Sequence, residues 1–113
     1  HRLLPEGLRA EIATEDGSVG HHGRVTELMG DHLSRGPWQV FCCGPTPMMR
    51  EAARISAQHG ALCHVSLEGH MACGFGVCVG CVVPHPSEAH PYRRYRRVCV
   101  EGPVFSAEEV EWT

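Results

Sequence analysis

The sequence predicts an α/β fold in which part of a doubly wound parallel sheet precedes a small, irregular β module. Short apolar runs alternate with segments of helical periodicity up to residue 68, and Gly and Pro separate them, as in sheets of this kind. From residue 69 to residue 81 the sequence becomes dense in Gly and Cys, and no regular element fits it. We therefore predict two parts, residues 1–68 and residues 69–113.

The first part begins with a predicted strand, a helix and a second strand. Residues 8–14 alternate apolar and polar side chains, which favours a strand. Residues 25–33 place apolar side chains at helical spacing and predict an amphipathic helix. Residues 38–43 form a short, mostly apolar run, which is typical of a strand buried on both faces. This order of elements favours a parallel sheet.

A second helix and a third strand complete the first part. Thr46 is suited to cap a helix that has Pro47 as its first residue, and an apolar face continues from there until Gly60. Residues 62–67 then predict another strand. The resulting series of three strands and two helices corresponds to the second half of a doubly wound, nucleotide-binding sheet.

The composition excludes several functional classes. The 113 residues are 42% hydrophobic and 20% charged, as in a folded domain, and no apolar run approaches the roughly 18 to 20 residues that cross a bilayer. All ten basic residues are Arg and the net charge is −3, so no broad electrostatic attraction to nucleic acid is expected, and we predict no nucleic-acid partner. The chain begins with His1 and lacks a secretory pattern, and we interpret this start as a cut rather than a natural terminus.

Four cysteines carry the strongest motif. Cys73, Cys78 and Cys81 form C-x4-C-x2-C, and Cys99 follows after 17 intervening residues, which is the plant-type [2Fe-2S] spacing. Four thiolates must converge on two irons while backbone N–H groups turn inward toward the sulfurs. The glycines that allow such a turn are Gly74, Gly76 and Gly80.

Other metal sites and other roles were considered for the cysteines, and they agree less well with the spacing. Four thiolates, or three with the imidazole of His70, could also hold a structural zinc ion, although the x4 spacing has no zinc rationale. No paired Cys-and-His pattern supports a Rieske centre. Cys42 and Cys63 are interpreted as core residues. Seven clustered cysteines are unlike a secreted disulfide scaffold and indicate a reducing cytoplasm.

The residues after the cysteine loop predict short β segments around 82–83, 97–100 and 104–105, with a Pro- and His-rich loop between the first two. Neither paired carboxylates nor a nucleophilic serine motif occurs, so no residue of this chain is predicted to be catalytic. The expected chemistry is therefore outer-sphere electron transfer.

Four stretches of the sequence are characteristic: ATEDGSVGHHGRVTELM, FCCGPTPMMR, HMACGFGVCVGCVV and YRRVCVEGPVFSAEEVEW. They resemble the electron-transfer subunits of dihydroorotate dehydrogenase, within the ferredoxin-NAD(P)+ reductase superfamily. The resemblance implies a flavin-binding barrel, a nucleotide-binding α/β domain and a C-terminal [2Fe-2S] module. Of these, this chain contains the second half of the nucleotide domain and the cluster module. The flavin motif is missing, so we do not expect the chain alone to be catalytically competent.

The resemblance also implies a function in pyrimidine biosynthesis. In the intact parent, FAD exchanges a hydride with NAD and passes single electrons through the cluster to a flavin on a catalytic dihydroorotate dehydrogenase subunit. Related sulfide dehydrogenases and NADH-ferredoxin oxidoreductases share this architecture, but some replace the first Cys with Asp, and Cys73 argues against them. A zinc-stabilised interaction module is the alternative from another class.

Two short segments are candidates for the NAD site. Thr14, Glu15 and Asp16 follow a predicted strand, where carboxylates favour a ribose 2′-OH and repel a 2′-phosphate. The segment Cys43-Gly44-Pro45 resembles the family loop that approaches the nicotinamide, where a side chain at Gly44 would block the ring.

Two surface features complete the expectations. Arg93, Arg94, Arg96 and Arg97 lie just before Cys99 and are explained by a solvated loop, by an offset of the cluster's negative charge, or by docking of the catalytic subunit. Strand edges left open by the missing half of the sheet favour self-association of this fragment.

Overall fold

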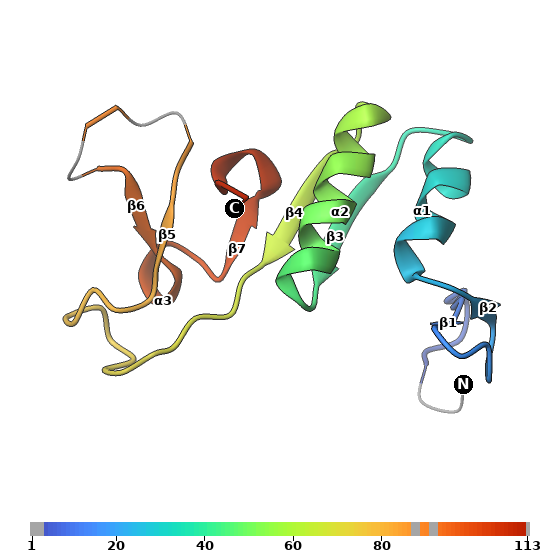
Figure 1. Cartoon of the computed structure of the whole chain (residues 1–113), viewed down its shortest axis with the longest axis horizontal. Helices are drawn as coiled ribbons and strands as arrows, with labels where there is room; N and C mark the ends of the chain where they lie inside the picture. The colour runs from blue at the N-terminus through green and yellow to red at the C-terminus, as the bar shows by residue number, and fades with distance from the viewer. Residues whose placement is uncertain (1–3, 87–88, 91–92, 113) are drawn as a thin grey trace.

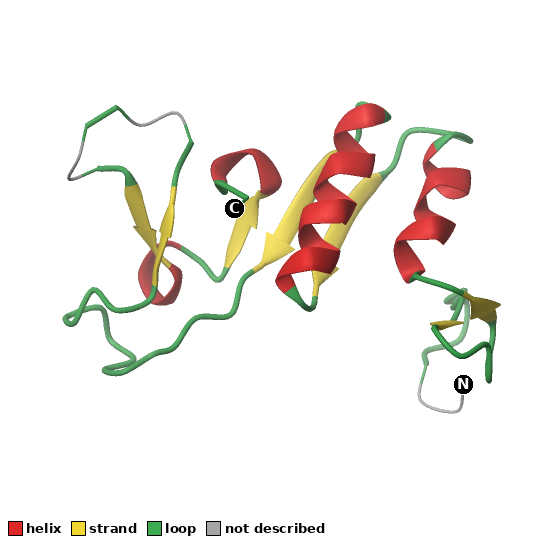
Figure 2. Ribbon diagram, in the orientation of Figure 1, coloured by secondary structure: helices red, strands yellow, loops and turns green. Residues whose placement is uncertain are grey.

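The computed structural model describes residues 4–86, 89–90 and 93–112 and has a mixed α/β architecture (Figures 1 and 2). Its elements are, in chain order, β1 (Ala13–Thr14), β2 (His21–His22), α1 (Val25–Leu33), β3 (Gln39–Cys43), α2 (Thr46–Gln58), β4 (Leu62–Ser66), β5 (Val82–Pro84), β6 (Tyr95–Arg97), α3 (Val98–Glu101), β7 (Val104–Ser106) and the 3-10 helix η1 (Ala107–Glu109). No helix in the described ranges is long and apolar enough to cross a bilayer.

The central unit is a parallel β-α-β arrangement. Strands β3 and β4 pair in parallel, with Val40 opposite Cys63 and Cys42 opposite Val65, and helix α2 connects them. Strand β7 then pairs with β4 in the antiparallel direction, so the sheet has the order β3-β4-β7. The predicted helix over 25–33 and the two parallel strands are confirmed, and the half-sheet is completed by a strand from the end of the chain.

Helix α2 begins one residue earlier than predicted. Thr46 is its first residue, so the expected N-cap at Thr46 is wrong. Pro45 occupies the N-cap instead, with ψ 142°, and its carbonyl accepts hydrogen bonds from the N–H groups of Met48 and Met49 at 2.9 and 3.1 Å. Two prolines thus stand at the start of the helix, where a missing N–H costs nothing.

The strand predicted over residues 8–14 is mostly absent. Only Ala13–Thr14 is extended and paired, and its partner is β2 rather than the main sheet. The apolar side chains that suggested the longer strand, Leu8 and Ile12, are 61% and 41% exposed. Alternation alone did not produce a strand here, because within the described residues no sheet lies against that segment to bury its apolar face.

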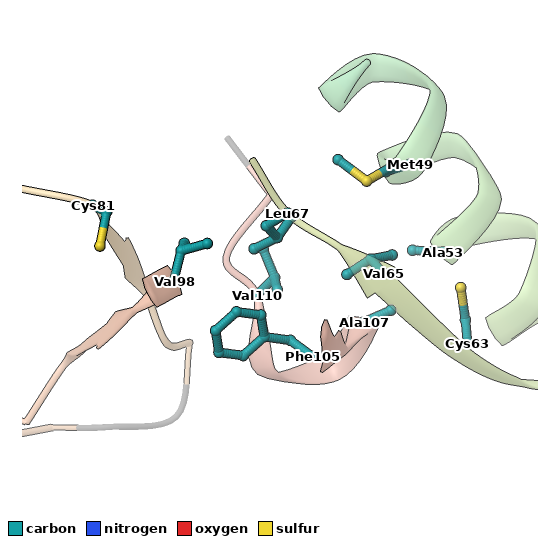
Figure 3. Packing of buried hydrophobic residues seen from close by; sticks show 10 residues of the cluster. All are labelled: Met49, Ala53, Cys63, Val65, Leu67, Cys81, Val98, Phe105, Ala107 and Val110. Carbon is teal, nitrogen blue, oxygen red and sulfur yellow. The ribbon is translucent and has the colours of Figure 1, made fainter. Parts of the chain in front are cut away.

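The core continues from helix α2, across the sheet, to the residues after the cysteine loop (Figure 3). Met49 and Ala53 of α2 belong to the same buried cluster as Val65 of β4, Phe105 of β7 and Val98 of α3. Cys63 is buried in this cluster, as predicted, and Cys42 packs against it half-buried. The two predicted parts of the chain therefore share one core, and their division at residue 68 stays a prediction.

The expectation that residues 38–43 are buried on both faces is wrong. Helix α2 covers one face of the sheet, but Trp38 and Phe41 are 54% and 71% exposed, and Leu62 of β4 is also exposed. Phe41 stacks on His64 of the neighbouring strand, with 5.1 Å between the ring centroids. A sheet face and an edge are thus open in the described part of the chain, which is the situation from which self-association was predicted.

The segment after the loop is also more varied than predicted. Strands β5 and β6 form an antiparallel pair, but residues 98–101 form the short helix α3 rather than a strand. The chain turns there because Glu101 folds back to accept a hydrogen bond from the backbone N–H of Arg97. After β7, a capping box between Ser106 and Glu109 forms η1, and the indole of Trp112 donates to the carbonyl of Ala107 at 3.0 Å.

We expect Val65→Ala to reduce the free energy of unfolding by about 2 to 3 kcal/mol, because Val65 is fully buried in the central strand and its methyl groups would leave a cavity. Val104→Ala is the matched control, since Val104 is 53% exposed on the neighbouring strand, and we expect it to cost about 0.5 kcal/mol or less. Urea unfolding of both variants measures the difference, and equal losses would contradict the described core.

Candidate metal centre

The four cysteines of the predicted cluster motif lie on or directly beside an irregular loop. Residues 69–81 contain neither a helix nor a strand; the loop leaves β4 and returns into β5, close to helix α3 (Figure 1). Gly74 and Gly76 have positive φ angles of 72° and 86°, and Val79 has a φ of 55°. These left-handed residues bend the backbone repeatedly within six residues, which other conformations would not allow in so short a segment.

The bent backbone surrounds the sulfur of Cys73 with hydrogen-bond donors. The backbone N–H groups of Cys78, Phe75 and Val77 bond this sulfur and lower the pKa of the Cys73 thiol to about 6. Three N–H groups aimed at one sulfur form an anion-binding nest. The inward-facing N–H groups that the glycine pattern predicts are therefore present around Cys73.

Cys81 and Cys99 form a second pair. Their sulfurs lie 3.2 Å apart, and the backbone N–H of Cys99 lies 3.4 Å from the sulfur of Cys81. That N–H lowers the pKa of the Cys81 thiol, whereas the bond to Cys81 raises the pKa of the Cys99 thiol. The pair is brought together because Cys81 directly precedes β5 and Cys99 lies in α3, which follows β6, the partner of β5. The N–H of Val98 also donates to the carbonyl of Cys81 at 2.9 Å.

The four thiols offer sulfur donors of the kind that iron and zinc both bind, and two of them already lie close together. The thiol of Cys81 donates to the sulfur of Cys99, the side chain of Cys78 helps to lower the pKa of Cys73, and the charge of Cys73 helps to raise the pKa of Cys99. Two sulfurs bound at about 2.3 Å to one tetrahedral metal lie about 3.8 Å apart, so Cys81 and Cys99, at 3.2 Å, need only a small movement to share one metal ion. Among the described residues, no three His, Cys, Asp or Glu side chains already converge on one metal position, and His70 is exposed.

The predicted NAD-site residues of the turn after β1 lie at a pocket, but only one of them lines it. Glu15 lines a pocket of about 400 Å³ at the N-terminus of α2, together with Arg24 and Glu51. Asp16 lies in the same turn, but its carboxylate accepts a hydrogen bond from the N–H of Ser18 at 3.0 Å, which lowers its pKa. Thr14 is committed to the turn as well, because its hydroxyl donates to the carbonyl of Val19 at 2.8 Å.

A second pocket, of about 540 Å³, lies between the β-α-β unit and the segment after the cysteine loop. Gly44 and Pro45 line it, and exposed Cys43 directly precedes them. Among the lining residues of this pocket that sequence analysis did not single out are Glu68, Glu111 and Trp112. Sequence analysis could have pointed to Glu111 and Trp112, because both lie in the last stretch that resembles the family. It gave neither residue a role.

Comparisons with known proteins agree with this geometry. Residues 68–111 match the family model described as the iron-sulfur cluster binding domain of dihydroorotate dehydrogenase B. The chain is 42% identical over 106 residues to the electron transfer subunit of dihydroorotate dehydrogenase B (NAD(+)) from Caldanaerobacter subterraneus subsp. tengcongensis, covering 93% of this chain and 42% of that protein. It is 42% identical over 108 residues to a homolog of that subunit from Aquifex aeolicus, covering 96% of this chain and 39% of that protein.

A solved structure is similar as well. It is reported for an NADH-dependent reduced ferredoxin-NADP oxidoreductase, in work on flavin-based electron bifurcation. The TM-score is 0.66 at 34% identity, and the match covers 86% of this chain and 33% of that chain. The chain thus spans about two fifths or less of the length of the proteins that it matches.

Its fold, its cysteine loop and the comparisons together make this chain similar to iron-sulfur cluster-binding, electron-transfer proteins. Within it, residues 68–111 are the part that matches the iron-sulfur cluster binding domain of dihydroorotate dehydrogenase B. The chain as a whole matches the C-terminal portion of the electron transfer subunits of that enzyme, and the family resemblance found in the sequence is confirmed.

In the metal-free, reduced chain, we expect Cys73 to react with iodoacetamide as a thiolate from about pH 6 upward and to reach a constant rate by about pH 7.5. A lowered pKa means that the reactive thiolate is already present at neutral pH. Burial raises the pKa of the Cys63 thiol, so its rate continues to rise above pH 9. Mass spectrometry of the labelled peptides gives both pH profiles, and a Cys73 profile centred near pH 9 would contradict the nest.

Proposed function

We propose that this chain is the C-terminal part of the electron-transfer subunit of an NAD-linked dihydroorotate dehydrogenase. Single electrons would pass through it between FAD in the intact subunit and the flavin of a catalytic partner subunit, in pyrimidine biosynthesis in the cytoplasm. The observation that carries this proposal is the close approach of Cys81 and Cys99, with sulfurs 3.2 Å apart, beside the loop that contains Cys73 and Cys78, within a segment that matches this domain family. Because the flavin motif is missing from these residues, the chain alone is not expected to be catalytically competent.

The residues that would hold a [2Fe-2S] cluster are Cys73, Cys78, Cys81 and Cys99. When bound, the cluster supplies one-electron transfer. The backbone N–H groups around Cys73 favour its thiolate and would lower the free energy of a negatively charged ligand set. Deprotonated sulfurs are needed for metal binding, so the lowered pKa of Cys73 favours loading at neutral pH.

The pocket at Gly44 and Pro45 is suited to bring a nucleotide near the cysteine loop. It lies at the carboxyl end of β3, where open α/β sheets bind ligands, and at the N-terminus of the 13-residue helix α2. Glu68, where the loop begins, and Val83, two residues after Cys81, line the same pocket. This contiguity supports the transfer of electrons between a nicotinamide or flavin held on this side and a cluster on the loop.

Selectivity for NAD over NADP is assigned to the turn after β1. Glu15 faces the pocket at the start of α2, and Asp16 places a second negative charge in the same turn. A carboxylate accepts a hydrogen bond from a ribose hydroxyl but repels a 2′-phosphate. Arg24 lines the same pocket and offers a positive charge to the phosphates of a dinucleotide.

A second candidate function has an observation of its own. The similarity to the ferredoxin-NADP oxidoreductase structure favours a subunit of a related NADH-ferredoxin oxidoreductase, and a sulfide dehydrogenase subunit is of the same kind. The sequence identity to that structure is 34%, against 42% to the dihydroorotate dehydrogenase B subunit. Cys73 also fits the dihydroorotate dehydrogenase pattern better. Reduction of the purified catalytic dihydroorotate dehydrogenase subunit by the intact protein, rather than of ferredoxin, separates the two.

The first test is an anaerobic absorption and EPR spectrum of the purified chain, before and after dithionite, with iron and zinc measured on the same sample. We expect visible absorption that bleaches, an S = 1/2 signal and about two irons per chain. A colourless chain with stoichiometric zinc and no iron after anaerobic reconstitution would contradict electron transfer and leave a zinc-stabilised module.

Cysteine variants test the ligand set. We expect Cys73→Ser, Cys78→Ser, Cys81→Ser and Cys99→Ser each to lower the iron content by more than about half, since each removes one thiolate of four. Cys43→Ser is the matched control, because Cys43 is exposed at the end of β3 and outside the loop, and we expect it to bind iron normally. Iron loss in Cys43→Ser equal to that in Cys78→Ser would refute the assignment.

A further inference from the structure

The middle of the cysteine loop is not held in place by burial. Its apolar side chains point to solvent, with Phe75 and Val77 74% and 70% exposed, and Val79 57% exposed. The loop also contains no helix or strand whose hydrogen-bond pattern would fix its backbone. Something other than a packed core must therefore keep residues 73–78 in one conformation.

One hydrogen bond reaches the middle of the loop from another element in the described part of the chain. The guanidinium Nη1 of Arg97 donates to the carbonyl oxygen of Gly76 at 3.1 Å. Gly76 stands between Cys73 and Cys78, so this bond fixes the bend that separates the two sulfurs. A bond from a charged donor is roughly twice as strong as a neutral one.

Arg97 is itself well anchored. It is the last residue of β6 and stands opposite Val82 of β5, directly after Cys81. Glu101 lies one turn further on, where its carboxylate accepts the backbone N–H of Arg97 and sits 3.7 Å from the guanidinium Nε. The guanidinium is thus oriented from the same short segment that carries Cys99.

The loop approaches this segment closely at Gly76. A Cβ atom added there would lie 2.6 Å from Cγ2 of Val100 and 3.8 Å from Nη1 of Arg97. Gly76 also has a φ of 86°, so only glycine meets both the backbone and the space requirement. Contact at Gly76 therefore joins the segment with three predicted ligands to the segment with the fourth.

We propose that Arg97 is a positioning residue of the iron-sulfur site, which holds the cysteine loop through the Gly76 carbonyl and places a positive charge beside the bound cluster. This inference rests on the proposed function. It distinguishes Arg97 from its neighbours, since Arg94 binds Glu111 at 3.1 Å and Arg96 donates to the carbonyl of Arg93 at 2.7 Å. Only the net charge of the Arg cluster, and no individual role, follows from the sequence.

The test compares Arg97→Gln with Arg96→Gln in the full chain, loaded anaerobically with its cluster. Both variants lose one positive charge from the same strand, but only Arg97 contacts the loop. We expect Arg97→Gln to lose cluster absorbance to a chelator roughly three- to tenfold faster than Arg96→Gln. We also expect shifted EPR g values and a lower midpoint potential in Arg97→Gln alone, because a nearby positive charge favours the reduced cluster.

Arg97→Lys keeps the charge and separates the two effects. We expect it to restore the midpoint potential while the cluster is still lost faster than in the wild type, since Lys cannot reproduce the guanidinium geometry. If Arg97→Gln takes up no cluster, the comparison of Arg97→Lys with Arg96→Lys decides by the same chelator assay. Equal rates, g values and potentials at positions 96 and 97 would overturn the proposal, and a wild-type chain that binds no iron would overturn the proposed function first.

Discussion

Negatively charged sulfurs that lie close together repel one another, and the structure around residues 69–81 offsets that repulsion with backbone dipoles. Three N–H groups face the sulfur of Cys73, and the N–H of Cys99 faces that of Cys81. These donors exist only because the backbone bends through positive φ at Gly74 and Gly76. A helix or strand would use the same N–H groups internally, so the cysteine loop has to be irregular.

An irregular loop needs rigid ends, and the sheet provides them. The loop starts from β4, which lies between β3 and β7, and it ends at β5, whose partner β6 leads into Cys99. Strand β7 then returns to β4, and the N–H of Leu67 donates to the carbonyl of Pro103 at 2.9 Å. Both ends of the cysteine segment are thereby fixed to one buried cluster, which includes Cys81 and Val98 as well as Val65. Separate cores for the two parts would leave the distance between the pocket at Gly44 and the cysteine loop unfixed.

Much of the local structure could be predicted from the sequence, because it depends on local chemistry. Apolar periodicity located α1 at its observed bounds, and Gly-Pro punctuation located β3 and the start of α2 to within one residue. The failures have a common cause in tertiary context. Residues 8–14 alternate like a strand, but in the described part of the chain only Ala13–Thr14 pair, with the short strand β2. Residues 97–100 divide between β6 and α3 because Glu101 folds back on Arg97. Partners distant in sequence decide such cases.

In the candidate site too, the sequence predicts what depends on local spacing and misses what depends on contacts between distant residues. Spacing alone pointed to the four cysteines, since C-x4-C-x2-C is a local property of the loop. The contact between Arg97 and Gly76 joins residues 21 positions apart and depends on the pairing of β5 with β6, which no short motif encodes. Composition suggested a uniform basic patch, whereas the folded chain gives neighbouring arginines different partners. Neighbouring arginines in a sequence can therefore have different roles. The role of each one follows from the atom that its guanidinium contacts in the folded chain.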